Sequence, residues 1–316
     1  MNLVAGDYAG VILAAGRGSR MGSLGEAYPK ALLPVANEPL ISHHLRMLCG
    51  LGLTEVYIVV GYRALDVVRV LGDGSQYGVT IHYLEQGAPL GSAHALGRAM
   101  PYVDKPFIMV LGDYYFSAYD PGRLIQHLNE GRSAIAAKRE PNRRLIIESC
   151  ELQTDGDGRV LNILEKPKMP ASDLKGCGFY ALQPEVFDSI ARTPRTALRD
   201  EYEIMVSLDL FIKAGHPLYA EEIITWDSNF TRPEDVLECN LVWLAQQSRN
   251  ELIGEDSYIE EGIQLEKAVI GNRASITGRG SLKEVVVFPD VRFEGMGPIE
   301  RSLMTPKAYI SCARSI

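Results

Sequence analysis

Residues 11–23 of the chain read VILAAGRGSRMGS, an apolar run that breaks into a loop rich in glycine and arginine. The first three of these residues suit a short buried strand. Glycines at positions 16, 18 and 22 let backbone N–H groups approach an anion, and Arg17 and Arg20 add forked, positively charged donors. The stretch therefore predicts a loop that binds phosphate directly after a buried first strand.

A second segment, residues 29–35 with the sequence PKALLPV, adds Lys30 as a compact cation. The loop lacks the Gly-Lys-Ser/Thr ending of a Walker motif, and its glycine spacing does not fit a dinucleotide fingerprint. Together the two segments resemble the opening motif of the sugar-1-phosphate nucleotidylyltransferases, the NDP-sugar pyrophosphorylases. The resemblance implies that Arg20 and Lys30 act on an NTP as catalytic residues. It also implies nucleotide contacts from Leu13, Ala14, Ala15, Gly16, Gly18 and Ser19.

Length and composition limit the classes of protein to which the chain can belong. A chain of 316 residues with 46% hydrophobic content can bury a large core, and its net charge of −8 argues against a general nucleic-acid binder. The five cysteines are scattered and odd in number, which favours reduced thiols in the cytoplasm. No stretch approaches about 20 apolar residues, so we expect no membrane span, and the N-terminal apolar run is too short for a signal peptide.

Strand-like and helix-like patterns alternate through the first two thirds of the chain. Helical patterns around 40–51 and 93–100 are followed by apolar runs at 56–60 and 107–111. This alternation predicts an α/β fold with a mainly parallel sheet covered on both faces. The family resemblance makes that sheet Rossmann-like and mixed, within a catalytic domain over residues 1–251.

Two further patterns concern the catalytic domain. Residues 155–158, DGDG, indicate a hairpin turn, since no glutamate follows at the spacing that a calcium loop requires. Residues 234–250 indicate a helix that closes the domain.

The residue pattern of the sequence changes in residues 252–316. Short β-type runs, such as those at 269–276 and 285–291, alternate with turns and small or polar residues. They resemble a few coils of a hexapeptide-repeat left-handed β-helix, with an ordinary β-hairpin appendage as the alternative. The segment is too short for an acetyltransferase domain. We therefore expect a small second domain that builds a homo-oligomer, with a dimer favoured.

Residues 86–94, QGAPLGSAH, are similar to the base-reading segment of the family. The Gln86 side chain carries one acceptor and two donors, so it can pair with the edge of uracil or thymine. The resemblance implies nucleotide contacts from Gln86, Gly91 and Ser92. His94 fits a packed helix residue better than a catalyst.

Leu111-Gly112-Asp113 ends an apolar run, at the place where an α/β sheet binds its ligands. A carboxylate there can hold Mg²⁺, although a helix N-cap is the alternative role for Asp113. The family resemblance implies the Mg²⁺ cofactor. It also places Tyr114, where the family has a small polar residue, beside the sugar.

The second metal ligand has two candidates in the segment WDSNFTRP, residues 226–233. The segment resembles the Trp-x-Asp motif of the family, which points to Asp227. Counting back from Pro233 instead puts Asn229 in the ligand position. We favour Asp227, because an anion holds Mg²⁺ better than an amide does.

The sugar side of the site is indicated by Leu164-Glu165-Lys166-Pro167, which matches the Glu-Lys-Pro motif of the family. Glutamate can accept hydrogen bonds from sugar hydroxyls, and lysine can neutralise a phosphate as a point charge. Glu165, Lys166 and, from the partner strand, Gly178 are therefore expected to bind the sugar phosphate, with Lys166 catalytic.

Substrate identity could diverge at residues 141–145, PNRRL, where the family often has a tyrosine–glycine pair. Leu145 there could crowd the substrate, and Arg143 and Arg144 could meet an additional acidic group.

These features combine into one expected reaction. A sugar 1-phosphate attacks the α-phosphorus of an NTP and expels pyrophosphate, with a uridylyl or thymidylyl donor favoured by Gln86. A guanylyl- or cytidylyltransferase acting on another sugar, polyol or choline phosphate remains an alternative. A non-catalytic regulatory subunit is the alternative from another class, although intact Arg20, Lys30, Asp113 and Lys166 argue against it.

Overall fold

The computed structural model describes residues 7–197 and 199–312, and it contains two compact units. The first unit combines Met1–Arg17 with His44–Asp227, and the second combines Gly18–His43 with Ser228–Ile316. The glycine loop beyond Arg17 thus groups with the C-terminal segment, although sequence patterns had placed it in the catalytic domain. The domain boundary near residue 251 stays a prediction.

The first unit is built on a nine-stranded sheet. Its strands are β1 Ala9–Ala14, β4 Glu55–Val60, β5 Thr80–Glu85, β6 Phe107–Leu111, β8 Ser133–Arg139, β9 Cys150–Thr154, β10 Val160–Glu165, β11 Leu174–Leu182 and β12 Leu218–Glu222. Strands β6, β1, β4 and β5 run parallel in that order. Strand β11 is antiparallel to both β6 and β8, and β9 and β10 form an antiparallel hairpin. The sheet is therefore mixed, as expected. Its β6–β1–β4–β5 half is parallel, and in the other half β12 runs parallel to β8, while the remaining pairs are antiparallel.

The central strand β1 is buried along its whole length because parallel strands flank it on both sides. Its side chains alternate between the two faces, and Ala9, Val11 and Leu13 belong to the main hydrophobic core. Gly10 faces the other way, where a Cβ atom would lie 3.1 Å from the Leu48 side chain. The missing side chain lets a helix approach that face closely.

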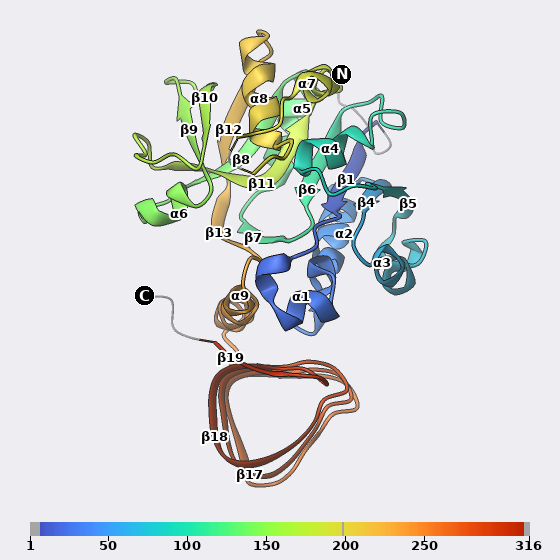
Figure 1. Cartoon of the computed structure of the whole chain (residues 1–316), viewed down its shortest axis with the longest axis vertical. Helices are drawn as coiled ribbons and strands as arrows, with labels where there is room; N and C mark the ends of the chain where they lie inside the picture. Colours follow the sequence, from blue (N-terminus) through green and yellow to red (C-terminus); the bar gives the residue numbers. More distant parts are fainter. Residues whose placement is uncertain (1–6, 198, 313–316) are drawn as a thin grey trace. The chain divides into compact units, whose positions relative to one another are not determined.

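Helices cover both faces of this sheet (Figure 1). They are α2 Leu40–Gly50, α3 Ala64–Leu71, α4 Ser92–Gly97, α5 Gly122–Asn129, α6 Arg143–Ile147, α7 Val186–Arg192 and α8 Ile204–Lys213, with a 3₁₀ turn at Ser75–Tyr77. Helices α4, α7 and α8 supply the core on the Val11 face through Leu96, Phe187 and Leu208. Within the described residues, no helix has the length and apolarity needed to cross a membrane.

A separate two-stranded sheet lies after β6 in the chain. It pairs β7 Tyr114–Ala118 with β13 Ile224–Asn229. The ring of Trp226 contacts that of Tyr115, with centroids 6.2 Å apart, and Thr225 donates a hydrogen bond to the Ser117 carbonyl. This pairing brings residues near 113 and 227 together, although they lie far apart in sequence.

The second unit begins with the glycine loop and includes helix α9. Its short elements are the 3₁₀ turns Ser19–Met21 and Lys30–Leu32, helix α1 Ser23–Ala27, strands β2 Pro34–Val35 and β3 Glu38–Pro39, and α9 Pro233–Gln246. The buried Asn240 of α9 donates to the Pro34 carbonyl at 2.9 Å and accepts from the Ala36 N–H at 2.8 Å. These bonds tie the segment after Lys30 to α9.

The C-terminal part of the second unit is a stack of parallel strands. They are β14 Glu251–Ile253, β15 Tyr258–Ile259, β16 Ile263–Ile270, β17 Ser275–Val287 and β18 Arg292–Met304, with β19 Tyr309–Ser311 antiparallel at the end. Glu251, Ala268, Val285 and Ser302 stand in register at intervals of 17 residues. Figure 1 shows the windings stacked with a triangular cross-section.

Charged residues mark the corners of these windings. Lys267, Glu284 and Arg301, again 17 residues apart, all have left-handed backbones with φ of 50°, 51° and 47°. The Glu284 carboxylate pairs with Arg301 at 2.6 Å and with Lys267 at 3.5 Å. Arg273 and Asp290 repeat this pattern at another corner, with a 2.8 Å ion pair. The left-handed positions of successive windings therefore carry paired opposite charges.

Candidate active site

The first part of the predicted phosphate loop is held by two neighbouring strand ends. The chain is buried from Tyr8 to Ala15 and becomes exposed at Gly16. A Cβ atom on Gly61 would lie 2.8 Å from the Ala15 carbonyl oxygen, and one on Gly112 would lie 2.9 Å from that of Leu13. The Gly112 N–H also donates to the Leu13 carbonyl. Both glycines allow the loop to leave β1 in a fixed direction.

The second part of the loop brings Lys30 against Gly18. Gly18 has a left-handed φ of 68°, and its carbonyl accepts a hydrogen bond from the Met21 N–H. A Cβ atom on Gly18 would lie 3.1 Å from the Lys30 stem, so the lysine packs over the bare backbone. Ser19 and Arg20 are exposed beside it. Loop and lysine thus form one local structure within the second unit.

Gln86, the predicted base reader, is 6% exposed. Its side-chain nitrogen Nε2 donates to the Gly91 carbonyl at 3.0 Å and lies 3.3 Å from His94 Nδ1. His94 in turn stacks on the Tyr202 ring. The amide therefore closes the loop 86–91, and base recognition by Gln86 stays a prediction.

Gly91 and Ser92 have structural partners of their own. Gly91 has φ of 108°, and a Cβ atom there would lie 2.5 Å from the Tyr202 carbonyl oxygen. Ser92 Oγ accepts a hydrogen bond from the Ile204 N–H at 3.0 Å. The segment docks against the start of α8, which gives this pair a packing role beside the expected nucleotide contact.

The predicted sugar-side pair sits at the end of β10. Lys166 has a left-handed φ of 48°, which is rare for a residue with a side chain, and its N–H donates to the Ser149 carbonyl at 2.8 Å. Such backbone outliers cluster at functional sites. Burial raises the pKa of Glu165 to about 7; the nearby Glu203 carboxylate adds to the rise, and Arg199 opposes it.

Arg199 is a candidate site residue that the sequence analysis did not identify. Its guanidinium lies 3.5 Å from Glu203, four residues further on, and its charge acts on Glu165. The available signal was an arginine four residues ahead of a glutamate at a helix start. The structure thus adds a second cation beside Glu165.

Tyr114 and Gly178 pack together in the interior. The Tyr114 hydroxyl donates to Asp227, and burial, followed by Cys177 and Asp227, raises the pKa of that hydroxyl well above its ordinary value. A Cβ atom on Gly178 would lie 3.0 Å from the Tyr114 ring. Both residues therefore have internal contacts, and their expected contact with a sugar stays a prediction. Asp113, directly before Tyr114, is half-buried.

Asp227 lies between two lysines. Lys138 Nζ is 2.7 Å from its Oδ1 and Lys175 Nζ is 2.5 Å from its Oδ2. Burial opposes ionisation, but the lysines outweigh it and hold the pKa of the Asp227 carboxyl below its ordinary value. Asn229, the other candidate ligand, follows two residues later in β13. Asn229 is exposed.

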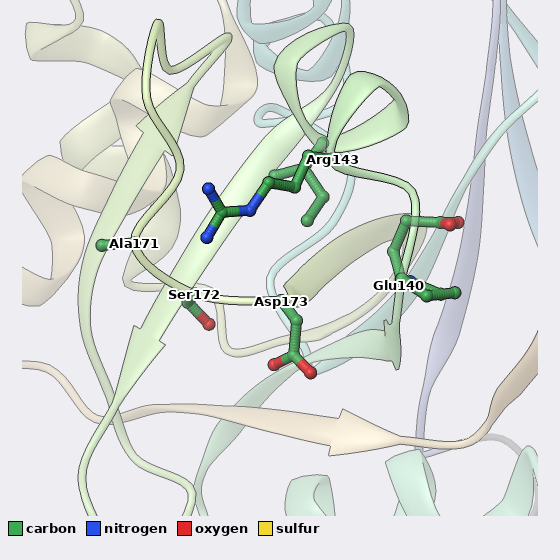
Figure 2. A pocket seen from close by; sticks show the side chains of 7 residues that line it. Glu140, Arg143, Ala171, Ser172 and Asp173 are labelled. Carbon is green, nitrogen blue, oxygen red and sulfur yellow. The ribbon is translucent and has the colours of Figure 1, made fainter.

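A cavity of about 450 Å³ lies between α6 and the segment before β11. It is lined by Glu140, Pro141, Arg143, Ile146, Ala171, Ser172 and Asp173. Figure 2 shows the Arg143 side chain extending toward the segment with Ala171 and Ser172. Arg144 instead pairs with Glu148 at 3.1 Å, and Leu145 is exposed. Of the three side chains expected to meet the substrate here, Arg143 lines this cavity, whereas Arg144 and Leu145 do not.

The family model described as Nucleotidyl transferase matches residues 9–228, which include β1, the loop, Asp113 and Lys166. The chain belongs to the nucleotidyl transferase family. It is therefore an enzyme of the class that transfers nucleotidyl groups, in agreement with the prediction from the glycine loop.

Curated relatives cover most of this nucleotidyl transferase. The low-salt glycan biosynthesis nucleotidyltransferase Agl11 of Haloferax volcanii is 32% identical, over 81% of this chain and 72% of its own length. A glucose-1-phosphate thymidylyltransferase of Streptomyces antibioticus is 28% identical, over 91% and 80%. The UTP–glucose-1-phosphate uridylyltransferase AglF of Haloferax volcanii is 31% identical, over 71% and 92%.

Solved structures share the fold of this nucleotidyl transferase. A Bacillus anthracis protein assigned as a glucose-1-phosphate thymidylyltransferase, in complex with sucrose, has a TM-score of 0.66 at 27% identity, over 74% of this chain and 94% of its own. A UDP-glucose pyrophosphorylase complexed with UDP-glucose has the same TM-score at 19% identity, over 77% and 100%. The second likeness bears on the fold alone.

The acidic residues of this nucleotidyl transferase differ in how well they suit a divalent cation. Among the described residues, no group of three or more histidine, cysteine, aspartate and glutamate side chains gathers as a protein-only metal site. Mg²⁺ usually takes one or two carboxylates together with substrate phosphates and waters, so Asp113 fits such a site. Asp227 fits poorly, because ammonium groups already contact both of its oxygens.

The raised pKa of Glu165 gives the nucleotidyl transferase a pH-dependent stability. The folded state binds this proton with a pKa of about 7 against about 4.5 in the unfolded chain, so stability falls as the pH rises between these values. Replacing Glu165 by glutamine removes the ionisation. We expect the variant to gain about 2 kcal/mol in free energy of unfolding relative to wild type between pH 5 and pH 7.5, measured by urea denaturation. A difference that is constant with pH would contradict the burial of this carboxyl.

Proposed function

We propose that this protein transfers a nucleoside monophosphate from an NTP to a sugar 1-phosphate, giving an NDP-sugar and pyrophosphate. The glycine loop carries the proposal, because it turns from buried to exposed at Gly16 and brings Lys30 over Gly18. The relatives named for glucose-1-phosphate thymidylyl or uridylyl transfer support it.

The triphosphate side of the reaction requires positive charge. In the proposed complex, Arg20 and Lys30 offset the charge of the NTP phosphates, and the N–H groups of the glycine loop bind the oxygens. Such preorganised donors stabilise the charge that shifts onto the leaving pyrophosphate. Leu13, Ala14 and Ala15 fix where the loop begins.

The sugar side is assigned to the end of β10. We propose that Glu165 accepts hydrogen bonds from sugar hydroxyls and that Lys166, assisted by Arg199, holds the sugar phosphate. A phosphate oxygen of the sugar then attacks the α-phosphorus in line. The attacking group is already an anion, so no general base is needed, and catalysis consists of positioning and charge neutralisation.

A divalent cation is part of the proposal, with Asp113 as its carboxylate ligand. When bound, Mg²⁺ would supply additional positive charge for the phosphates. Asp113 is suited to this role because it is half-buried and follows β6 at the carboxyl end of a parallel strand.

Donor and substrate preferences are assigned to two places. We favour a thymidylyl or uridylyl donor, since the Gln86 side-chain oxygen can still accept from a base N–H while its nitrogen holds Gly91. Arg143 faces the cavity beside α6, where it could receive an acidic group of the substrate.

The C-terminal windings are proposed to be a short left-handed β-helix. The 17-residue register, the parallel pairing and the triangular cross-section of the windings (Figure 1) support this assignment. We further propose that this segment builds a homodimer, for which light scattering is the direct measure. The free thiols are consistent with a cytoplasmic enzyme.

Pyrophosphate release tests the proposal directly. The full-length protein is incubated with dTTP, UTP, GTP or CTP against a panel of hexose 1-phosphates. We expect turnover with dTTP or UTP at least ~10-fold above that with GTP or CTP, because a mismatched base leaves polar groups unpaired. Excess chelator should abolish release, and Mg²⁺ should restore it.

Each departure from this pattern has a distinct meaning. Preferred turnover with GTP or CTP would keep the reaction and reassign the base. Full activity in chelator would reject the cation. No release with any pair would overturn the transferase assignment and favour a regulatory subunit.

A further inference from the structure

Asp227 is the centre of a buried charge cluster in the first unit. Lys138 on β8 and Lys175 on β11 each place Nζ within 2.7 Å of one of its carboxylate oxygens. The Tyr114 hydroxyl donates a hydrogen bond to Oδ2. Lys138 also reaches Glu140, at 2.8 Å. We refer to these five side chains as the Asp227 cluster.

The sheet register explains why an anion is needed here. Lys138 and Lys175 stand directly opposite one another across the antiparallel pair of β8 and β11. Like charges in that position repel, and these two have little access to screening solvent, since Lys175 is 8% and Lys138 is 14% exposed. Asp227 comes from another strand, β13, and contacts both ammonium groups. It supplies the charge that makes this cross-strand pair tolerable.

The cluster is also balanced in charge. Two lysines face two carboxylates, Asp227 and Glu140, whose side chains are 1% and 5% exposed. Buried ions are tolerated when they are paired and hydrogen-bonded, and removing one partner is strongly destabilising. The arrangement therefore has the properties of an internal ion network.

The same contacts make Asp227 a poor ligand for a divalent cation. Oδ2 already accepts from Tyr114 and Lys175, and Lys138 lies 2.7 Å from Oδ1. The two ammonium groups would repel a second positive charge at the same place.

We propose that Asp227 is the shared counter-ion of the Lys138–Lys175 pair, and that it is therefore not a ligand of the divalent cation. The cation half of this proposal rests on the proposed function. The counter-ion half stands on the geometry of the cluster alone.

Measurements of metal binding by the full-length protein test the cation half of the proposal. Mn²⁺ alone is titrated by electron paramagnetic resonance, and the Mg²⁺ concentration for half-maximal pyrophosphate release is measured in parallel. We expect Asp227→Asn to change both values less than twofold and Asp113→Asn to weaken both at least ~10-fold. Equal weakening by Asp227→Asn and Asp113→Asn would overturn the proposal.

A double-mutant cycle, with thermal unfolding as the measurement, tests the counter-ion half of the proposal. Asp227→Asn is expected to lower the Tm by roughly 10 °C, because it leaves two opposed ammonium groups without their anion. Adding Lys175→Met should recover part of this loss, since it removes one of the two charges. Losses that simply add would overturn the counter-ion assignment. If wild type neither binds Mn²⁺ nor responds to Mg²⁺, the cation part of the proposed function fails, and the cycle still decides the role of Asp227.

Discussion

Lys166→Ala is expected to lower kcat/KM at least ~100-fold, as the loss of a preorganised charge at a reacting phosphate typically does. The KM for the sugar 1-phosphate should rise much more than that for the NTP, because the proposed contact is to the attacking group. Alanine can keep the left-handed backbone of Lys166, with φ of 48°, and the hydrogen bond from its N–H to Ser149. Steady-state kinetics with each substrate varied in turn provide the measurement.

Lys168 is a matched control for this experiment. It lies two residues further along the same segment and is exposed, so Lys168→Ala removes a nearby charge without touching the end of β10. We expect near wild-type kinetics from this variant. Equal effects of Lys166→Ala on the KM of both substrates would indicate a structural lysine instead.

Arg20→Ala and Lys30→Ala are each expected to reduce turnover at least ~100-fold with the fold intact. Both cations belong to the loop proposed to hold the triphosphate. Pyrophosphate release under saturating NTP, together with circular dichroism, measures the two quantities. Near-normal turnover in both variants would remove the basis for the phosphate loop.

Lys30→Met separates charge from packing in this loop. The Lys30 stem lies over Gly18, so alanine removes both the stem and the charge. Methionine keeps an apolar stem but lacks the charge. Because we assign the role of Lys30 to its charge, we expect Lys30→Met to be as inactive as Lys30→Ala. Recovered activity in Lys30→Met would mean that Lys30 acts by packing. Arg69→Ala, at a largely exposed position on α3, controls for the loss of a surface cation.

Much of the fold was predictable because its strongest signals are local. The helix expected around 40–51 is α2, and the strand expected at 107–111 is β6. The turn at 155–158 forms through Asp155, whose side chain accepts from the N–H groups of Asp157 and Arg159. Apolar periodicity and turn residues carry this information within a few positions of sequence.

The antiparallel half of the sheet was not predictable in the same way. Strand β11 is buried on both faces and inserts between β6 and β8, so its composition resembles that of a parallel strand. Its direction depends on which distant strands it meets. Nothing in its own residues encodes that choice.

The candidate site shows a similar limit. The glycine loop, Asp113 and Glu165 could be found by motif, since each lies in a short contiguous pattern. The contacts of Asp227 could not, because Lys138 and Lys175 come from strands far away in sequence. Arg199 was missed for the same reason, as its relation to Glu165 arises only in the folded chain.

The central place of β1 has a consequence for the synthesis of this chain. One neighbour, β4, follows soon after β1, but the other, β6, begins only at Phe107. Until that strand leaves the ribosome, several seconds later at about 5–20 residues per second, β1 presents an unpaired edge of apolar residues. Such an edge is a template for pairing with another chain. The nascent protein therefore passes through an interval in which binding of a chaperone to this edge would protect it from aggregation.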